Sequence, residues 1–233
     1  MEISVVIPAY NEASVIRGTI DDVQAYMNNW GVAYEIILVD DGSTNTTADA
    51  VRALPAVTLI TNEVNRGKGY SVRRGVLAAT GDLILFMDAD NSTKIRELDR
   101  MRNEIASNDI VIGSRALASS RITVRQNIAK VSLGRMGNTL IRFVLGLPFK
   151  DTQCGFKLFR RKTQDIFKVM TLDRWGFDFE LLFLASKRQY RILESPVVWE
   201  NNFDSKVRAA SYFSTFFDMI RVRIRYLMGN YKY

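Results

Sequence analysis

The strongest candidates for chemistry in this sequence are two aspartates, Asp88 and Asp90, that follow an apolar run of strand length at residues 83–87. Residues i and i+2 of a strand point in the same direction, so both carboxylates can converge on one hard cation where the strand ends. An unpaired charge beside a buried strand is costly, and a metal that bridges a diphosphate makes the placement useful. The alternative is that both aspartates only form a turn or cap a helix.

Two further segments carry polar side chains beside turn glycines. Residues 39–43 read as a strand end followed by two acids, a glycine and a serine, and a carboxylate there can accept a hydrogen bond from a nucleobase edge. The alternative is an ordinary strand-to-helix turn with capping side chains. Residues 65–69 form a basic loop with two glycines that can line a diphosphate pocket. That loop lacks the leading glycine and the Ser or Thr of a P-loop.

The residue types that are absent or rare narrow the possible chemistry. None of the 233 residues is histidine, which excludes His-based metal sites, Ser–His and Cys–His nucleophile pairs and imidazole general bases. Any metal must be bound by oxygen atoms, which favours Mg²⁺ or Mn²⁺ over Zn²⁺. The single cysteine, Cys154, excludes an internal disulfide and fits a reducing compartment. We expect it to be a packed small side chain.

Strand and helix patterns alternate along the first half of the chain. Near-continuous apolar strands between helices predict an α/β fold with a mostly parallel sheet and helices on both faces. Ligands bind beyond the carboxyl ends of such strands, which places the three polar segments at one edge. The expected strands are residues 3–7, 35–39, 57–60, 83–87 and 109–112, and the expected helices are 12–29, 45–53, 68–79 and 94–105.

The second half of the chain is less regular. Its patterns predict a helix near 125–145, a strand over 155–159, helices near 162–170 and 178–188, and a strand around 191–199. No repeat, low-complexity region or Pro/Ser-rich linker divides the chain. We therefore expect one domain, residues 1–204, followed by a C-terminal segment, residues 205–233.

These motifs, in this order, resemble glycosyltransferase family 2. The resemblance extends over nearly the whole chain and implies a GT-A type, Rossmann-like fold. In the second half the chain is similar to the dolichyl-phosphate β-glucosyltransferases, which transfer glucose from UDP-glucose to a polyprenyl phosphate with inversion. The matching segments are residues 6–12, 39–43, 65–69, 81–82 and 88–90, then 113–115, 151–159, 174–182, 199–200 and 223–229.

The resemblance implies roles for the matched residues at the nucleotide and its metal. Asp40 or Asp41 would bind the uracil edge, and Pro8, Tyr10 and Glu12 would border the nucleoside. Asp90 would be the direct metal ligand, and Asp88 would approach both the ribose and the metal. When bound, the metal neutralises the diphosphate as it leaves. The full set assigned to this part of the site is Pro8, Tyr10, Glu12, Asp40, Asp41, Lys68, Asp88, Ala89 and Asp90.

A phosphate acceptor needs positive charge rather than a base. The second pKa of a phosphate monoester is about 6, so the acceptor is mostly dianionic at pH 7. We expect Arg115, Arg125 and Lys157 to bind it, since an arginine fork can grip two phosphate oxygens. The alternative for Arg125 is a solvated helix residue. Asp151 and Asp178 lie where other family members keep a catalytic base. Asp151 would orient the acceptor or Lys157, or would simply form a turn.

The C-terminal segment, residues 205–233, has six basic residues and one acidic residue, within a chain of net charge +7. An apolar stripe on one helical face, with Arg221 and Arg223 beside it, is typical of a helix at a membrane interface. The alternative is that the stripe packs on the protein's own core. The stripe is Phe213, Phe216, Phe217, Ile220, Ile224 and Leu227, with Tyr212, Tyr226, Tyr231 and Tyr233 nearby; a second apolar helix contains Met136, Leu140, Ile141, Val144 and Leu145.

The chain begins directly in a strand pattern and contains no run of roughly 20 apolar residues, so neither a signal peptide nor a spanning helix is predicted. We expect a peripheral enzyme on the anionic cytoplasmic face of a membrane, with a possible membrane partner subunit. Alternatives are the same chemistry with GDP-mannose or a UDP-N-acetylhexosamine, or a non-catalytic protein that binds an anionic surface. No nucleic-acid-binding motif is present, so no nucleic acid partner is expected.

Overall fold

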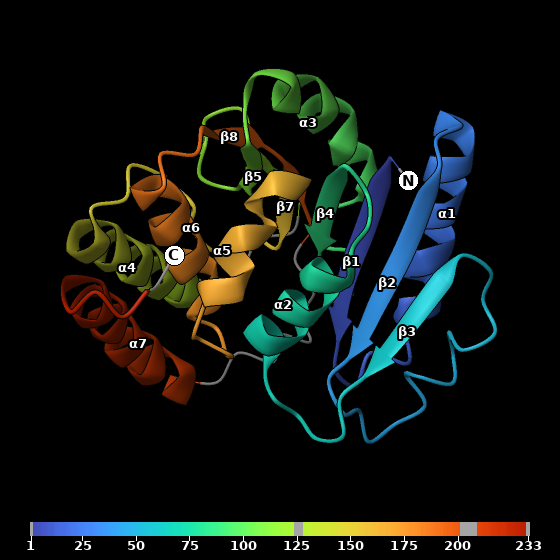
Figure 1. The fold of residues 1–233 in the computed structure, drawn as a ribbon, viewed down its shortest axis with the longest axis horizontal. Helices are drawn as coiled ribbons and strands as arrows, with labels where there is room; N and C mark the ends of the chain where they lie inside the picture. Colours follow the sequence, from blue (N-terminus) through green and yellow to red (C-terminus); the bar gives the residue numbers. More distant parts are fainter. Residues whose placement is uncertain (1, 124–127, 201–208, 232–233) are drawn as a thin grey trace.

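The computed structural model describes residues 2–123, 128–200 and 209–231 (Figure 1). Within them, one sheet has the strand order β3–β2–β1–β4–β7–β5–β8. Its strands are β1 (Ile3–Ala9), β2 (Tyr34–Asp40), β3 (Val57–Thr61), β4 (Leu83–Met87), β5 (Ile110–Ser114), β7 (Phe156–Arg160) and β8 (Ile192–Pro196). Two short strands, β6 (Arg121–Ile122) and β9 (Val198–Trp199), pair separately.

The predicted mostly parallel sheet is confirmed. β1 pairs in parallel with β2 and β4, β2 with β3, and β5 with β8, whereas β7 runs antiparallel between β4 and β5. The parallel register brings Ala9 of β1 opposite Asp40 of β2, and the antiparallel register brings Met87 of β4 opposite Phe156 of β7. The polar segments that follow β1, β2 and β4 therefore share an edge with the segment that precedes β7.

Helices cover both faces of the sheet, because alternate strand residues point to opposite sides. Val6 and Phe86 face a core formed with α2, α4, α5, α6 and α7, whereas Val5 and Leu85 face a core formed with α1 and α3. The helices are α1 (Ile16–Trp30), α2 (Lys68–Ala78), α3 (Leu98–Glu104), α4 (Ile128–Leu145), α5 (Gln164–Val169), α6 (Phe177–Lys187) and α7 (Ala209–Leu227).

Two predicted helices take a different form. In the predicted helix 45–53, residues 46–53 form consecutive turns. The Asn45 side chain accepts hydrogen bonds from the Thr47 amide (3.1 Å) and hydroxyl (2.5 Å) and so competes with helical bonding. The Thr47 hydroxyl in turn accepts the Glu12 amide at 2.9 Å, so these turns hold the loop after β1. The predicted helix at 94–105 is divided into α3 and short 3₁₀ segments on either side.

α7 packs beside α4 at the left of Figure 1. Its inward side chains are Met219 and Val222, which are buried, whereas Phe217 and Leu227 of the predicted stripe are 67% and 70% exposed. The described side chains of the stripe thus do not form the face that packs on the core, and that of Phe213 lies outside the described residues. Tyr231, predicted to be an interfacial ring, is instead buried. Within the described part of the chain, no helix is long and apolar enough to span a membrane.

Candidate functional site

The site lies at the sheet edge where β1, β2, β4 and β5 end and β7 begins. Backbone hydrogen bonds join the segments there. The Asp41 amide donates to the carbonyl oxygen of Ala9 at 2.8 Å, and the Asp88 amide donates to that of Gly155 at 3.0 Å. Parallel strands open their carboxyl ends toward a crevice in such sheets, and this edge holds most of the residues that the sequence singles out.

Asp88 is held between a lysine and a glycine. Lys68 Nζ lies 2.6 Å from Asp88 Oδ1, so the two side chains form an ion pair. A Cβ added to Gly155 would lie 1.9 Å from Asp88 Oδ2, so the carboxylate rests directly on the glycine backbone. Gly155 belongs to the segment 151–159 that carries the family resemblance, but the sequence does not indicate this role.

The loop after β4 fixes Asp90 beside Asp88. The Ser92 amide donates to Asp90 Oδ1 at 3.0 Å, and the Thr19 hydroxyl donates to the carbonyl oxygen of Ala89 at 2.7 Å. Asn91 adopts a left-handed conformation with φ of 55°, which asparagine tolerates better than most residues. Burial and the negative charge of Asp88 raise the pKa of Asp90. A divalent cation would relieve this repulsion.

The donor set fits Mg²⁺ or Mn²⁺. Asp88 and Asp90 would supply carboxylate oxygens as ligands, and the described residues contain no group of three or more His, Cys, Asp or Glu side chains that could enclose a metal. Mg²⁺ is typically bound through one or two carboxylates together with substrate phosphates and water. The two aspartates are therefore suited to a metal that is shared with a diphosphate rather than to a closed structural metal site.

Lys68 lies at the start of α2, where the predicted basic loop ends. Its Nζ is 5.4 Å from the ring centre of Phe86 and 5.5 Å from that of Trp175. Burial lowers the pKa of Lys68, but the charges of Asp88, Asp178 and Asp90 outweigh burial and the pKa is raised. A permanent cation thus lies beside the paired carboxylates. Trp175 belongs to the segment 174–182 that carries the family resemblance, but the sequence does not predict its place at the site.

The two aspartates after β2 have different environments. Asp41 accepts hydrogen bonds from the Asn62 side chain (2.7 Å) and from the Arg66 and Gly67 amides (3.0 and 2.8 Å). Asp41 therefore shapes the loop that leads to Lys68, and its expected contact with a nucleobase stays a prediction. Asp40 Oδ1 accepts the Ser43 amide at 3.3 Å and the Ser43 hydroxyl. Across the described residues no donor bonds Asp40 Oδ2, so that oxygen is available to a ligand.

The loop after β1 borders the same edge. Tyr10 and Glu12 are half-buried, whereas Pro8 is buried within β1. The expected contact of these residues with a nucleoside stays a prediction. The Asn11 amide donates to the Ser43 hydroxyl at 2.9 Å, and Asn11 Oδ1 accepts the Thr44 amide at 2.9 Å. These bonds hold the first and second polar segments together.

Arg115 and Asp151 form a two-point ion pair. Arg115 Nε donates to Asp151 Oδ2 at 2.7 Å and Nη2 donates to Oδ1 at 3.0 Å. Burial raises the pKa of Asp151, but Arg115 outweighs this effect and the pKa falls to about 2. The predicted role of Asp151, to orient the acceptor or Lys157, is thus corrected: Asp151 orients Arg115. The Arg115 side chain is 32% exposed. Its Cζ atom lies 5.6 Å from the ring centre of Trp199.

Replacing Asp151 with asparagine is expected to lower the free energy of unfolding by about 2 kcal/mol at neutral pH. The folded-state pKa of Asp151 is about 2 against an ordinary 3.8, so the stabilisation is present above pH 3.8 and lost as pH falls toward 2. Urea unfolding at pH 7, 5 and 3 measures this.

The matched control for this experiment is Asp82→Asn, which breaks an exposed ion pair with Arg161. It should change the free energy of unfolding by less than about 1 kcal/mol. A difference between Asp151→Asn and the parent that stayed constant across pH would contradict the role of the ion pair.

Lys157 does not face the crevice. Its side chain is 0% exposed, and its Nζ donates to the carbonyl oxygen of Cys154 at 2.5 Å and to Asp178. The prediction that Lys157 binds the acceptor phosphate is therefore wrong; Lys157 and Asp178 form a buried pair that joins β7 to α6. Cys154 is buried, as predicted, and burial raises its pKa to about 12. Arg125 lies outside the described residues.

Comparisons with known proteins agree with this arrangement. The family model described as glycosyl transferase family 2 matches residues 4–167. A dolichyl-phosphate beta-glucosyltransferase of Dictyostelium discoideum is 35% identical over 249 residues, which covers 99% of this chain and 76% of the relative. One of Saccharomyces cerevisiae is 33% identical over 256 residues, which covers 99% of this chain and 76% of the relative.

Solved structures share the fold. Glucosyl-3-phosphoglycerate synthase of Mycobacterium tuberculosis, in complex with Mn²⁺, UDP-glucose and phosphoglyceric acid, superposes with a TM-score of 0.70 at 19% identity, covering 95% of this chain and 79% of that one. Mannosyl-3-phosphoglycerate synthase of Rubrobacter xylanophilus gives 0.72 at 18% identity, covering 99% and 75%. With the sheet, the paired aspartates and the matching family model together, this chain belongs to glycosyltransferase family 2.

Proposed function

We propose that this chain transfers glucose from UDP-glucose to a polyprenyl phosphate such as dolichyl phosphate, with inversion and with bound Mg²⁺ or Mn²⁺. The product is a lipid-linked sugar for glycosylation. One observation carries the proposal: Lys68 Nζ lies 2.6 Å from Asp88, one of the paired carboxylates, and the ion-paired Arg115 follows the end of β5 at the same edge of the sheet. A reaction that brings a diphosphate and a phosphate monoester together needs a cation for each anion.

The proposed reaction requires no general base. The acceptor phosphate is mostly dianionic at neutral pH, so its oxygen can attack the anomeric carbon directly. The new carbon–oxygen bond forms as the bond from the anomeric carbon to UDP breaks, and UDP leaves with the bonding electrons. When bound at Asp88 and Asp90, the metal stabilises the charge on that leaving group. Lys68, which lies beside Asp88, adds a fixed positive charge.

Arg115 is the proposed residue for the acceptor phosphate. Asp151 engages Nε and Nη2 of the guanidinium, and no bond to Nη1 is present in the described parts of the chain. The free edge of the guanidinium is held in one orientation by the ion pair, which limits the entropy lost when phosphate binds. Arg125, which lies outside the described residues, is proposed as a second phosphate ligand on the grounds of sequence alone.

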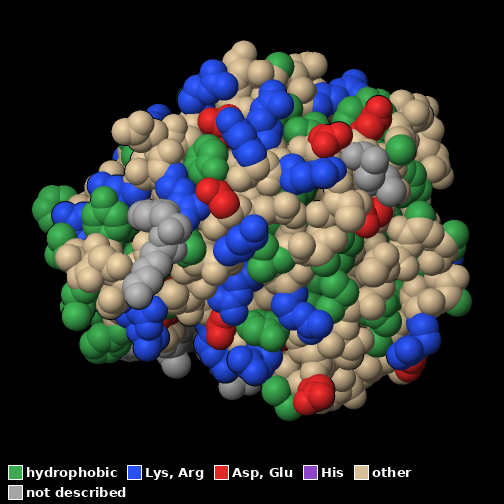
Figure 2. Space-filling model, in the orientation of Figure 1, with side chains coloured by type: hydrophobic (Ala, Val, Ile, Leu, Met, Phe, Trp, Pro, Cys, Tyr) green, Lys and Arg blue, Asp and Glu red, His purple; other side chains and the backbone are tan. Residues whose placement is uncertain are grey.

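The acceptor and the exposed apolar face of α4 and α7 support membrane association. Figure 2 shows hydrophobic side chains at the left rim, over α4 and α7, with Lys and Arg side chains beside them. Phe143 of α4 is 86% exposed, and large exposed apolar patches mark interaction surfaces. We call this surface the α4–α7 face and propose that it contacts the bilayer. Its residues are Met136, Leu140, Phe143, Phe216, Phe217, Ile224, Leu227 and Met228.

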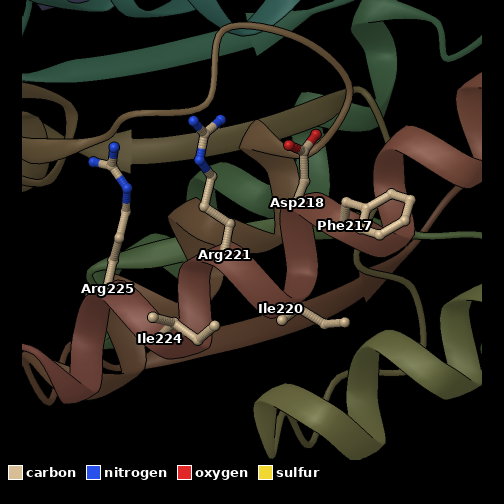
Figure 3. Close-up of a pocket in the computed structure, with 6 residues that line it drawn as sticks. All are labelled: Phe217, Asp218, Ile220, Arg221, Ile224 and Arg225. Atoms are coloured by element: carbon tan, nitrogen blue, oxygen red, sulfur yellow. The ribbon is translucent and has the colours of Figure 1, made fainter.

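Basic side chains beside the α4–α7 face support an anionic membrane as its partner. A shallow pocket of about 460 Å³ is lined by Phe217, Asp218, Ile220, Arg221, Ile224 and Arg225. In Figure 3, Arg221 and Arg225 extend from one side of α7 while Ile220 and Ile224 extend from another. The cytoplasmic leaflet carries anionic lipids, which is why we propose that face of a membrane for this enzyme.

Replacing Phe143 and Leu227 together with serine is expected to lower binding to phosphatidylserine-containing vesicles by about tenfold or more, because partial burial of each side chain contributes about 1 kcal/mol. Transfer to a short, water-soluble prenyl phosphate should be unchanged. Co-sedimentation measures the first quantity and label transfer the second. Leu77→Ser is the control, since Leu77 is also an exposed apolar residue but lies on α2. Equal binding by both variants would contradict membrane contact through this face.

The donor experiment tests the proposed function itself. Purified protein, dolichyl phosphate, detergent and Mn²⁺ or Mg²⁺ are incubated with labelled UDP-glucose, GDP-mannose or UDP-N-acetylglucosamine, and label is counted in the organic extract. Label from UDP-glucose that EDTA abolishes is the expected result. Label from another donor would show that the enzyme transfers that sugar and not glucose. Label from none of the donors would favour a different acceptor or a non-catalytic surface protein.

A further inference from the structure

The chain returns into the catalytic core after α7. Gly229 adopts a left-handed conformation with φ of 67°. Its amide donates to the carbonyl oxygen of Tyr226 at 3.1 Å, and the Asn230 amide donates to that of Arg225 at 3.0 Å. These two bonds are the Schellman ending of a helix, which reverses the chain direction at a glycine. The next residue, Tyr231, is consequently directed inward and is buried.

Tyr231 contacts a buried carboxylate on α6. Its hydroxyl donates to Glu180 Oε1 at 2.7 Å, and burial together with the charge of Glu180 raises the pKa of Tyr231. Glu180 is itself fully buried and has no lysine or arginine within ion-pair distance in the described chain. A buried carboxylate without a cation must be stabilised by hydrogen bonds alone. The tyrosine hydroxyl is one of the few donors that do so.

The other donors to Glu180 belong to the segment between α5 and α6. The Thr171 amide and hydroxyl donate to Oε1 at 2.9 and 2.8 Å, and the Leu172 amide donates to Oε2 at 2.8 Å. Two consecutive backbone amides of this segment are therefore fixed by the same carboxylate that Tyr231 contacts. The position of residues 171–172 depends directly on where Glu180 is held.

Residues 172–175 form one wall of the loop that carries Lys68. A Cβ added to Gly69 would lie 2.6 Å from the carbonyl oxygen of Leu172, and one added to Gly67 would lie 2.5 Å from that of Asp173. The Tyr70 amide donates to the Asp173 carbonyl at 3.0 Å. These contacts leave no space between the two segments. A shift of residues 171–173 would therefore move the start of α2.

The last step reaches the paired carboxylates. Trp175, in the same segment, lies 5.5 Å from Lys68 Nζ, and Lys68 Nζ lies 2.6 Å from Asp88 Oδ1. A continuous set of contacts thus runs from Tyr231 through Glu180 to the segment 171–175, and from there to Lys68 and Asp88. Tyr231 also directly follows the turn that closes α7, the helix whose outer side belongs to the α4–α7 face.

We propose that Tyr231 and Glu180 are positioning residues for the donor site: the end of the C-terminal segment holds the wall against which Lys68 and its loop are set. The proposal rests on the proposed function for the identity of the donor. It makes the C-terminal segment part of the active-site architecture as well as a surface helix. Neither residue touches the substrate.

Tyr231→Phe tests the proposal, because it removes one hydroxyl and keeps the ring. Amide exchange of residues 171–172 should accelerate about fivefold or more, since one donor to their acceptor is lost. The Kd for UDP with Mn²⁺ and the KM for UDP-glucose should both rise three- to tenfold, while kcat changes less than twofold. Exchange is measured by mass spectrometry and UDP affinity by calorimetry.

Tyr226→Phe is the matched control. Tyr226 also belongs to α7, and its ring packs on Phe183 at 5.1 Å, but its hydroxyl has no hydrogen bond within the residues that the structure describes. Tyr226→Phe should leave amide exchange at 171–172, the Kd for UDP and the KM for UDP-glucose unchanged. Gly229→Ala, which opposes the left-handed turn without adding a steric contact, should repeat the effect of Tyr231→Phe.

Two outcomes would overturn the proposal. One is that Tyr231→Phe changes only the melting temperature, with exchange at 171–172 and UDP affinity equal to those of Tyr226→Phe. The other is that kcat falls while UDP affinity stays constant. Failure of the proposed function is distinguishable, because the exchange and UDP measurements need neither a lipid acceptor nor glucosyl transfer.

Discussion

Replacing Asp90 with alanine is expected to lower the proposed glucosyl transfer by about a thousandfold or more. A Lewis acid at a leaving diphosphate contributes several kcal/mol, and each 1.36 kcal/mol is about a tenfold change in rate. Asp90 lies just after the end of β4. Its Oδ1 accepts a hydrogen bond from the Ser92 amide, which leaves Oδ2 for a metal. Loss of Asp90 removes one of the two paired carboxylates that are suited to hold the metal.

The experiment separates metal binding from catalysis. Mn²⁺ binding in the presence of UDP is followed by calorimetry, and turnover by label transfer. Asp82→Ala is the matched control, because Asp82 precedes the same strand at its opposite end and is exposed; it should leave both measurements unchanged. Vesicle binding should be unaltered in both variants. Full Mn²⁺-dependent transfer by Asp90→Ala would show that Asp90 is not the metal ligand.

Where the sheet and its functional edge lie could be predicted because each signal is local. Apolar strands that alternate with helices indicate a parallel sheet, and the carboxyl ends of parallel strands meet at one edge. That reasoning correctly places Asp40, Asp88 and Asp90 together. The sequence contains no comparable signal for the antiparallel β7, since a strand of five residues reads the same in both directions. Its insertion between β4 and β5 depends on contacts far apart in the chain.

The roles of the charged residues could not be predicted, because each depends on a distant partner. From the sequence alone, Lys157 is expected to be an exposed cation. In the structure it is buried and pairs with Asp178, which lies 21 residues later in the chain. Arg115 and Asp151 are separated by 36 residues, and their ion pair decides which edge of the guanidinium is free. Tyr231 belongs by composition to an interfacial segment, but the turn at Gly229 directs it inward. Composition indicates the kind of surface and not the direction of one side chain.

The cations of the site are each held by a carboxylate that is not consumed in the proposed reaction. Asp151 orients Arg115 at 2.7 Å, and Asp88 holds Lys68 at 2.6 Å. Pairing keeps Lys68 charged despite burial, and in both pairs it fixes where the remaining hydrogen-bond donors of the cation point. Preorganised charge of this kind acts at the transition state without first having to reorganise. The absence of histidine is consistent with a site that orients anions and transfers no proton.

Replacing Gly155 with alanine is expected to reduce turnover by at least about a hundredfold while the protein stays folded. The added Cβ would lie 1.9 Å from Asp88 Oδ2 and 2.3 Å from Cγ, so the carboxylate must leave its place. It cannot move without cost, since the Asp88 amide is bonded to the Gly155 carbonyl at 3.0 Å and Lys68 holds Oδ1. Overpacking of this kind costs about 1–3 kcal/mol of stability, whereas a displaced metal ligand costs catalysis directly.

Gly18→Ala provides the control, because a Cβ at Gly18 in α1 would meet nothing within 4 Å. It should raise the free energy of unfolding by about 0.5–1 kcal/mol, as expected for glycine in a helix, and leave turnover unchanged. For Gly155→Ala, Mn²⁺ affinity in the presence of UDP should fall at least about tenfold, in parallel with turnover. If Gly155→Ala instead kept the Mn²⁺ affinity of the parent and lost only stability, the Asp88 carboxylate would not be a metal ligand, and Asp90 alone would remain for that role.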